Sequence, residues 1–301
     1  MTTLQETIIP TKRVRRITVL ISGSGSNLQA LLDSTSTSRL PNCQITYVIS
    51  SRSNAYGLIR AKNNKPFSIP TKICSLKTFQ NKNKNSTRED YDCEISRLIL
   101  NSKPDLVVLA GWMHILSDKF LQILNGQIKP PLSPTLPPPP SSSTTSTEKE
   151  IQLPDLNDLK ISDNDKIEKT SSSSSFKGEQ VKITSNEEKE ESNFPEPPLH
   201  QSFPIPIINL HPALPGQFDG ANAIGRAFEA FQKGEIKNTG VMVHRVVAEV
   251  DRGEPLVVRE IEIKKEDKLE DLEARIHEVE HQIIVEGAKL VLEELDKEGR
   301  P

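Results

Sequence analysis

The chain has 301 residues and a mass of 33.6 kDa, enough for one large domain or two small ones. Hydrophobic residues make up 35% of it, and adding the glycines gives about 40%, below the 45–50% of ordinary globular proteins. Its 38 basic and 41 acidic residues give a net charge of −3, which excludes a generally basic nucleic-acid-binding protein. We expect a cytoplasmic protein, because no run of 18 apolar residues predicts a membrane span and the three cysteines form no CxxC pair.

Strands and helices alternate along the first part of the chain. Residues 16–21 form an apolar strand, and the sequence SNLQALLD then opens a helix with Ser26 as its N-cap. Further strands are predicted at 44–50 and 105–110, and further helices at about 54–63 and 87–102. Repeated units of this kind predict an α/β fold, a mostly parallel twisted sheet flanked by helices, with ligands at the carboxyl ends of its strands.

The turn between the first strand and the first helix reads ISGSGSNLQ, residues 21–29. Gly23 and Gly25 supply a tight turn, and Ser26 and Asn27 add side-chain donors beside the backbone N–H groups of a helix N-terminus. The turn is not a Walker A motif, and it lacks the third glycine of a dinucleotide-binding turn. The pattern favours phosphate binding over a plain strand-to-helix turn.

A segment of different composition interrupts this pattern at about 129–203. Pro130 to Thr147 hold seven prolines, and of the whole 75 residues only 14 are apolar, with a net charge of −5. Such a segment buries too little apolar surface to offset its ordering entropy, whereas the remaining residues reach about 46% apolar when their glycines are counted, inside the globular range. We therefore predict a disordered insertion at 129–203 in a single domain of 16–128 and 204–301, after a flexible tail at 1–15.

The sequence after the insertion returns to regular elements. A strand is predicted at 205–210, a helix at 219–233, a strand pair at 240–247 and 255–263, and an amphipathic helix at about 268–297. The last helix places its apolar residues on one face: Leu269, Leu272, Ile276, Val279, Ile283 and Leu290.

The motif Asn209 to Pro212 ends the strand at 205–210. Because proline follows His211, the histidine is held extended, and Asn209 leaves the same side of the strand. A histidine beside an amide donor suits acyl transfer, because the imidazolium can act as an acid and the amide can stabilise the oxyanion. The alternative is a histidine in a turn that is capped by its neighbours and has no catalytic role. Asp251, in EVDRGEP, is a typical turn residue between two strands. It gains a functional role only if it pairs with His211 and raises the pKa of that histidine.

Residues 277–281 read HEVEH and match the helical zinc-protease signature. They fall in the amphipathic helix near the end of the sequence, with few residues following to complete a protease cleft. We interpret them as charged residues on a solvated helix face and predict no metal site.

Five segments in order resemble a single family. ISGSGSNLQALLD, SSRSNAYGLIRA, PDLVVLAGWMHIL, IINLHPALPG and HRVVAEVDRGEP closely resemble the phosphoribosylglycinamide formyltransferases, in particular the fungal ones. The resemblance implies a Rossmann-like formyltransferase fold and formyl transfer from 10-formyltetrahydrofolate to the amine of 5'-phosphoribosylglycinamide, without a metal. We accordingly expect small-molecule substrates, no nucleic-acid or membrane partner, and a monomer or homodimer.

The resemblance also implies residue roles. The catalytic trio is Asn209, His211 and Asp251, in which the aspartate keeps the imidazole charged near neutral pH. The substrate phosphate binds at Gly25, Ser26 and Asn27, and folate binds at Arg88, Met113, His114, Ile115, Leu116, Asn209, Val247, Ala248 and Glu249. Two departures leave contacts open: His114 stands where arginine is common, and Gly220 to Ile224 replace a stretch that carries histidines in bacterial forms.

Three alternatives remain at this stage. The resemblance extends to methionyl-tRNA formyltransferase and formyltetrahydrofolate hydrolase, which share the Asn-His-Asp set. The first adds a C-terminal tRNA-binding barrel, and the second adds an N-terminal regulatory domain. Only one helix is expected after Asp267, and about 15 residues precede the first strand, so neither addition is expected here. The third alternative is a nucleotide-binding protein that has lost the reaction, and the intact trio argues against it.

Overall fold

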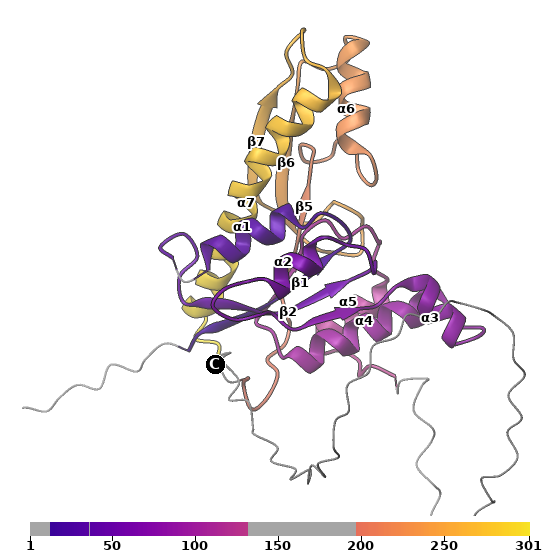
Figure 1. The fold of residues 1–301 in the computed structure, drawn as a ribbon, viewed down its shortest axis with the longest axis vertical. Coiled ribbons are helices and arrows are strands. Elements are labelled where there is room, and N and C mark those ends of the chain that lie inside the picture. Colours follow the sequence, from indigo (N-terminus) through magenta and orange to yellow (C-terminus); the bar gives the residue numbers. More distant parts are fainter. Residues whose placement is uncertain (1–12, 36, 132–196) are drawn as a thin grey trace, which may run out of the picture. The chain divides into compact units, whose positions relative to one another are not determined.

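Almost uninterrupted apolar sequence forms the central strands, as expected for a sheet that is covered on both faces. In this computed structural model, which describes residues 13–35, 37–131 and 197–301, β1 is buried along its whole length. The sheet has seven strands in the order β3-β2-β1-β4-β5-β6-β7 (Figure 1). The strands are β1 (Arg15–Ile21), β2 (Cys43–Ser50), β3 (Thr71–Ile73), β4 (Leu106–Leu109), β5 (Ile207–His211), β6 (Asn238–Arg245) and β7 (Pro255–Glu262).

The first five strands are parallel, and β6 and β7 are antiparallel to their neighbours. Seven helices connect or cover the strands within the described residues. They are α1 (Ser26–Ser34), α2 (Gly57–Lys62), α3 (Leu76–Lys82), α4 (Arg88–Ser102), α5 (Asp118–Leu124), α6 (Ala223–Gln232) and α7 (Leu269–Lys297). The predicted α/β fold with a mostly parallel sheet and a C-terminal helix is confirmed.

Two apolar cores lie on opposite faces of the sheet, because successive side chains of a strand point to opposite sides. Ile17 and Val19 of β1 belong to the core beneath α1 and α7, whereas Leu20 belongs to the core beneath α4 and α5. Figure 1 shows α1 and α7 on one side of the sheet and α3, α4 and α5 on the other. Helices thereby cover both faces of the central strands, whereas β3 and β7 at the two edges of the sheet keep exposed residues.

Several local predictions need correction. Ser26 is the first residue of α1 rather than its N-cap; Gly25 holds that position in the left-handed conformation, with φ 70°, and no side chain caps the helix. Leu290 is exposed on α7, where Val291 and Leu295 are buried instead. The helix predicted from 219 begins at Ala223.

Two short elements, β3 and α3, were not expected from the sequence. β3 has three exposed residues and is defined only by its pairing with β2. The α3 helix begins at a Ser75 cap whose hydroxyl accepts from the N–H of Thr78. Neither β3 nor the α3 helix is long enough for its residues to form a periodic apolar pattern in the sequence.

Most of the insertion predicted at 129–203 lies outside the described residues, as does the tail before residue 13. Its end contacts the domain: Lys103 Nζ donates to the carbonyl oxygens of Pro198 and Leu199 at 3.0 and 3.3 Å. Gln201 Nε2 donates to the Pro104 carbonyl at 2.9 Å. These contacts lie beyond the C-terminus of α4, at the amino ends of the parallel strands.

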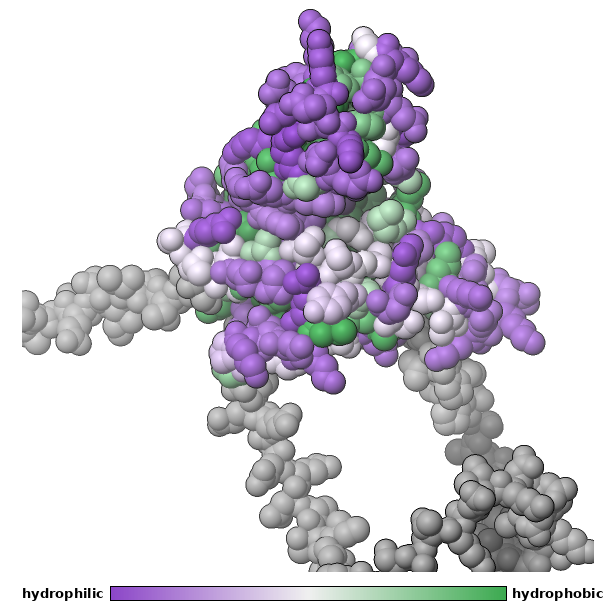
Figure 2. All heavy atoms as spheres, turned by 45° about the horizontal axis from the view of Figure 1, so that its top comes forward, coloured by the Kyte–Doolittle hydropathy of each residue, from purple (hydrophilic) through white to green (hydrophobic). Residues whose placement is uncertain are grey.

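The described surface is largely polar. In the view of Figure 2, hydrophilic residues predominate, and apolar residues appear in small separate groups. No helix in the described part of the chain is long and apolar enough to cross a membrane.

Candidate active site

A cleft of about 670 Å³ opens at the carboxyl ends of β1, β4 and β5. In the sheet, β1 lies between β2 and β4. The connection that follows β1 leads to β2 on one side, whereas β4 and its following loop lie on the other side. The loops after β1 and β4 therefore diverge and leave a crevice between them. The cleft is lined by the turn after β1, the loop after β4, the end of β5, the loop after β6 and one face of α7. It therefore lies where the sequence predicts a ligand.

The turn after β1 forms one end of the cleft. A Cβ on Gly25 would lie 2.5 Å from the Cα of Gly57, so only glycine fits this close approach. The N–H of Gly57 donates to the Gly23 carbonyl at 3.2 Å, and Arg60 Nε donates to the Ser24 carbonyl at 2.9 Å, which fixes the turn from behind. The N-terminus of α1 therefore faces the cleft with its first N–H groups free of intrahelical partners, as an anion site requires.

The predicted trio meets in the middle of the cleft. Asn209 and His211 leave the same side of β5, and the loop after β6 brings Asp251 to them. Asn209 Nδ2 donates to Asp251 Oδ1 at 3.1 Å, and His211 Nδ1 lies 3.3 Å from Asp251 Oδ2. The N–H of Gly220 also donates to Asp251 Oδ2 at 2.8 Å. The structure thus brings together three side chains that are up to 42 residues apart.

The electrostatics of His211 differ from the expectation. Burial lowers the pKa of His211 below its ordinary value, and the attraction of Asp251 and the Gln217 carbonyl, 3.5 Å from Nε2, only partly offsets this. The prediction that Asp251 keeps this imidazole charged near neutral pH is therefore wrong: Asp251 raises the pKa of His211, but burial lowers it more. Burial thus favours the neutral ring.

Asp251 itself is ionised. Burial opposes its charge, but its contacts with His244, with the N–H of Gly220 and with His211 hold the pKa of this carboxyl below its ordinary value. The residue has φ +56°, a left-handed conformation that is strained for a residue with a side chain. The loop places this carboxylate over β5 despite that strain.

The loop after β4 forms the other wall. Met113, His114, Ile115 and Leu116 all line the cleft, and Met113 and Ile115 are 61% and 65% exposed. Exposed apolar side chains at a cleft are typical of a surface for a flat organic ligand. Burial and the charge of Arg88 lower the pKa of His114, so it is neutral near pH 7.

Arg88 supports this wall rather than lining the cleft. Its Nη2 donates to the Ile115 carbonyl, and its Nε lies 3.1 Å from Asp92 Oδ1. The other oxygen of Asp92 accepts from the N–H of Ser117 at 3.0 Å. In the structure Arg88 therefore shapes the loop from behind.

The remaining predicted residues line the cleft. Val247, Ala248 and Glu249 form its border on the loop after β6. The stretch from Gly220 to Ile224, whose contacts the sequence left open, also lines it.

Comparisons with known proteins identify the family of this chain. A family model described as formyl transferase matches residues 15–135 and 195–287. The chain belongs to the formyl transferase family. It is 34% identical over 281 residues to the phosphoribosylglycinamide formyltransferase of Schizosaccharomyces pombe, covering 93% of this chain and 98% of that one.

Two further comparisons extend this. The phosphoribosylglycinamide formyltransferase of Dictyostelium discoideum is 35% identical over 277 residues, covering 91% of this chain and 97% of that one. Among solved structures, glycinamide ribonucleotide transformylase 1 from Symbiobacterium toebii is similar in fold, with a TM-score of 0.60 and 24% identity. That similarity covers 97% of this chain and 93% of the other.

This formyl transferase also has cleft residues that the sequence did not predict, and they lie on α7. Glu280, 5% exposed, accepts from His277 Nδ1 at 2.8 Å and from Asn27 Nδ2 at 3.4 Å. The hydrogen bond to Glu280 raises the pKa of His277. The interpretation of HEVEH as a solvated helix face is thus wrong for Glu280. Glu280 lies four residues after Ile276 and therefore on the same apolar face of the helix, which is the sequence signal that indicated its burial.

His277 pairs with Glu280 and not with Glu278, the base of the zinc-protease interpretation. Within residues 13–35, 37–131 and 197–301, no group of three His, Cys, Asp or Glu side chains is arranged to hold a metal ion. The motif therefore contributes polar groups to the cleft instead.

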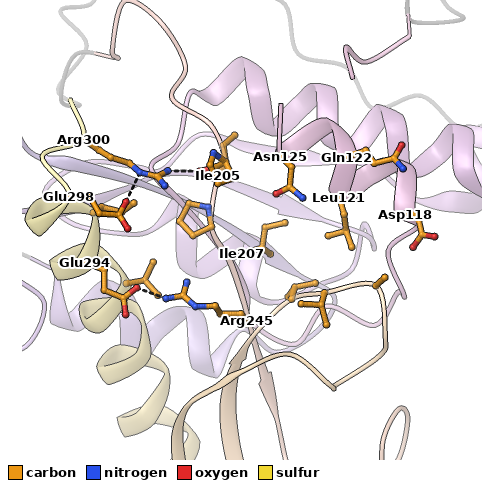
Figure 3. A pocket seen from close by; sticks show the side chains of 17 residues that line it. Asp118, Leu121, Gln122, Asn125, Ile205, Ile207, Arg245, Glu294, Glu298 and Arg300 are labelled. Carbon is orange, nitrogen blue, oxygen red and sulfur yellow. Dashed lines mark hydrogen bonds and ion pairs between the residues drawn. The ribbon is translucent and has the colours of Figure 1, made fainter. Parts of the chain in front are cut away.

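A second cavity of about 590 Å³, drawn in Figure 3, shares the loop after β6 with the cleft. Val246, Val247 and Ala248 line both. Figure 3 shows Arg245 at the base of this loop reaching across to Glu294 of α7. This ion pair anchors the start of the loop that carries Asp251.

Proposed function

We propose that this formyl transferase transfers the formyl group of 10-formyltetrahydrofolate to the amine of 5'-phosphoribosylglycinamide. The products are formylglycinamide ribonucleotide and tetrahydrofolate, in purine biosynthesis. The observation that carries the proposal is the meeting of Asn209, His211 and Asp251 between an anion-binding turn and an apolar wall. The names of the fungal and slime-mould relatives support the same acceptor.

The two ends of the cleft suit the two substrates. The turn at Gly25, Ser26 and Asn27 offers N–H groups to the ribonucleotide phosphate. Glu280 and His277 beside it offer polar groups to the rest of the ribonucleotide. The wall of Met113 to Leu116 and the loop of Val247 to Glu249 offer mainly apolar contact to the folate.

The chemistry follows from the state of His211. Because burial favours its neutral ring, it accepts a proton from the glycinamide amine as the new C–N bond to the formyl carbon forms. Asp251, ionised and 3.3 Å from Nδ1, stabilises the imidazolium that results. The imidazolium then returns the proton to N10 of the folate as the bond between N10 and the formyl carbon breaks.

Negative charge grows on the formyl oxygen during this transfer. A tetrahedral oxyanion needs hydrogen-bond donors at its own position, and one such donor contributes about 10²–10³ in rate. Asn209 is the amide in the middle of the cleft that carries N–H groups for this purpose. We assign it that role.

The finer properties of the protein are proposals as well. We propose a cytoplasmic enzyme, monomeric or homodimeric, that acts on small molecules without nucleic acid or metal. The three cysteines, all buried and free, fit a reducing compartment. We also propose that the insertion at 129–203 is disordered, on the grounds of its composition.

His211→Ala tests the proposal. Purified protein is mixed with glycinamide ribonucleotide and a 10-formyl folate, and the folate absorbance is followed. We expect kcat to fall by at least about 10² in His211→Ala with the melting temperature nearly unchanged, and His200→Ala, an exposed histidine, to behave as wild type. Near-wild-type turnover in His211→Ala contradicts the mechanism, and wild-type protein inactive with this acceptor contradicts the function.

A further inference from the structure

The trio has a fourth neighbour that neither the sequence nor the proposed chemistry uses. His244 lies on β6 directly opposite Asn209 of β5 and is 2% exposed. Its Nε2 is 3.2 Å from Asn209 Nδ2 and 3.4 Å from Asp251 Oδ1. The three polar atoms form a triangle in which each lies within hydrogen-bonding range, or close to it, of the other two.

The position of one proton on His244 is fixed by the backbone. Its Nδ1 is 2.8 Å from the Arg245 carbonyl oxygen, which can only accept, so Nδ1 carries a hydrogen. That carbonyl is held in place because the N–H of Arg245 donates to Glu254 O at 2.9 Å and that of Val246 to Ile207 O at 2.9 Å. The Arg245 guanidinium pairs with Glu294 as well (Figure 3).

The state of Nε2 therefore decides the arrangement of the triangle. In the neutral ring Nε2 has a lone pair and accepts one N–H of Asn209, while the other goes to Asp251 Oδ1 at 3.1 Å. Both amide hydrogens are then used inside the protein, and the amide oxygen is the edge left for the cleft. An oxyanion cannot be stabilised by that edge.

A proton on Nε2 reverses this. The N–H of Nε2 donates to Asp251 Oδ1 and no longer accepts from Asn209, so an amide N–H becomes available to the cleft. The titratable groups that face the ring are Asp251, from the loop after β6, and His211, from β5.

We propose that His244 is a positioning residue of the transfer reaction, whose ring selects which edge of the Asn209 amide faces the cleft. It acts through Asn209 and does not itself touch substrate. The proposal rests on the proposed function, since it assigns the Asn209 N–H to the formyl oxygen. It predicts that an Asn209 N–H is available to the formyl oxygen only when Nε2 of His244 donates to Asp251 Oδ1.

Four variants test this in the folate absorbance assay: His244→Phe, His244→Gln, Asn209→Ala and the double variant His244→Phe/Asn209→Ala. Phenylalanine keeps the ring and removes both nitrogens, so we expect kcat to fall about 10- to 100-fold with KM changed less than about threefold. Glutamine restores an uncharged amide near Nε2, and we expect it to recover at least about tenfold over phenylalanine. His281→Phe, a histidine of α7 outside the cleft, is the matched control.

The double variant separates positioning from a structural role. If His244 acts through Asn209, then His244→Phe adds less than about twofold once the amide is absent, because interacting residues are non-additive. Additive losses overturn the proposal, and so does His244→Phe with kcat within twofold of wild type. A wild-type enzyme inactive with the proposed substrates contradicts the proposed function instead, so the two failures are distinct.

His244→Gln provides a second readout that also serves if His244→Phe does not fold. Its amide can donate to Asp251 Oδ1 as the N–H of Nε2 does, so we expect its kcat to stay within about tenfold of wild type with KM nearly unchanged. A fall of kcat by more than about 10² in folded His244→Gln overturns the proposal.

Discussion

Gly253 lies where the loop carrying Asp251 returns to β7, and replacing it with alanine tests how tightly this corner is built. A Cβ at this position would lie 1.6 Å from the carbonyl oxygen of Arg245 and 3.4 Å from His244 Nδ1. The φ of Gly253 is not in the left-handed range, so the whole effect of Gly253→Ala is steric. The obstructing atom is backbone, which cannot rotate away.

The magnitude follows from that overlap. A normal contact requires the Arg245 carbonyl to move by about 1.5 Å, and overpacking of this kind destabilises proteins by about 1–3 kcal/mol. The movement also strains the hydrogen bond from the Arg245 N–H to Glu254 O, worth about 1 kcal/mol. We expect Gly253→Ala to lower the free energy of unfolding by about 2–4 kcal/mol. It should also lower kcat, because the moved carbonyl no longer holds His244.

Urea unfolding and steady-state kinetics of Gly253→Ala check this. The matched control is Gly234→Ala: its Cβ meets nothing within 4 Å, and only its φ of +76° opposes a side chain, at about 1 kcal/mol. We expect kcat of the control to equal that of wild type. Gly253→Ala with the stability of Gly234→Ala and unchanged kcat refutes the reasoning.

Three further predictions follow from the site and its surroundings. Gly25→Ala places a Cβ 2.5 Å from the Gly57 Cα at φ +70°, so KM for the ribonucleotide should rise at least about tenfold; an unchanged KM contradicts the anion site. The hydrogen bond from Arg275 lowers the pKa of Asp267 to about 2, so this carboxylate stabilises the folded protein above about pH 4 and stops doing so as the pH falls to about 2. The stability gap between wild type and Asp267→Asn should therefore close between those values in urea titrations, and a constant gap opposes this. Deletion of Pro137–Glu191 should leave kcat within about threefold of wild type, because the cleft is lined by residues 22–116 and 209–280; a large loss of kcat means that the insertion contributes to the site.

The parts of the fold that the sequence predicted are those with long, regular patterns. β1 and β5 are apolar runs, and α4 and α7 have helical periodicity over several turns, so each pattern alone selects one structure. β3 is different, since three exposed residues become a strand only by pairing with β2. On α7 the sequence predicts Leu290 as buried, but the structure buries Val291 instead. The cause is similar, because the neighbouring elements along so long a helix decide which of its residues are buried.

The candidate site divides in the same way. The turn at Gly25 and the pair Asn209 and His211 are local motifs whose geometry follows from adjacent residues. His244 and Glu280 have no such motif: one is a polar residue within an apolar strand, and the other lies on the apolar face of a helix. A buried polar residue signals a partner across space, and the sequence does not say which partner that is.

The sequence by itself determined the α/β fold, the position of the cleft at the strand ends, and three parts of its lining: the turn at Gly25, the wall of Met113 to Leu116, and the pair Asn209 and His211. Only the tertiary structure decided the charge of His211. The sequence supplies Asp251 as a partner that favours the imidazolium, but desolvation depends on every element packed around the ring, and here it outweighs a partner at 3.3 Å. Burial is a sum over distant parts of the chain, and the role of base that we propose for His211 follows from that sum.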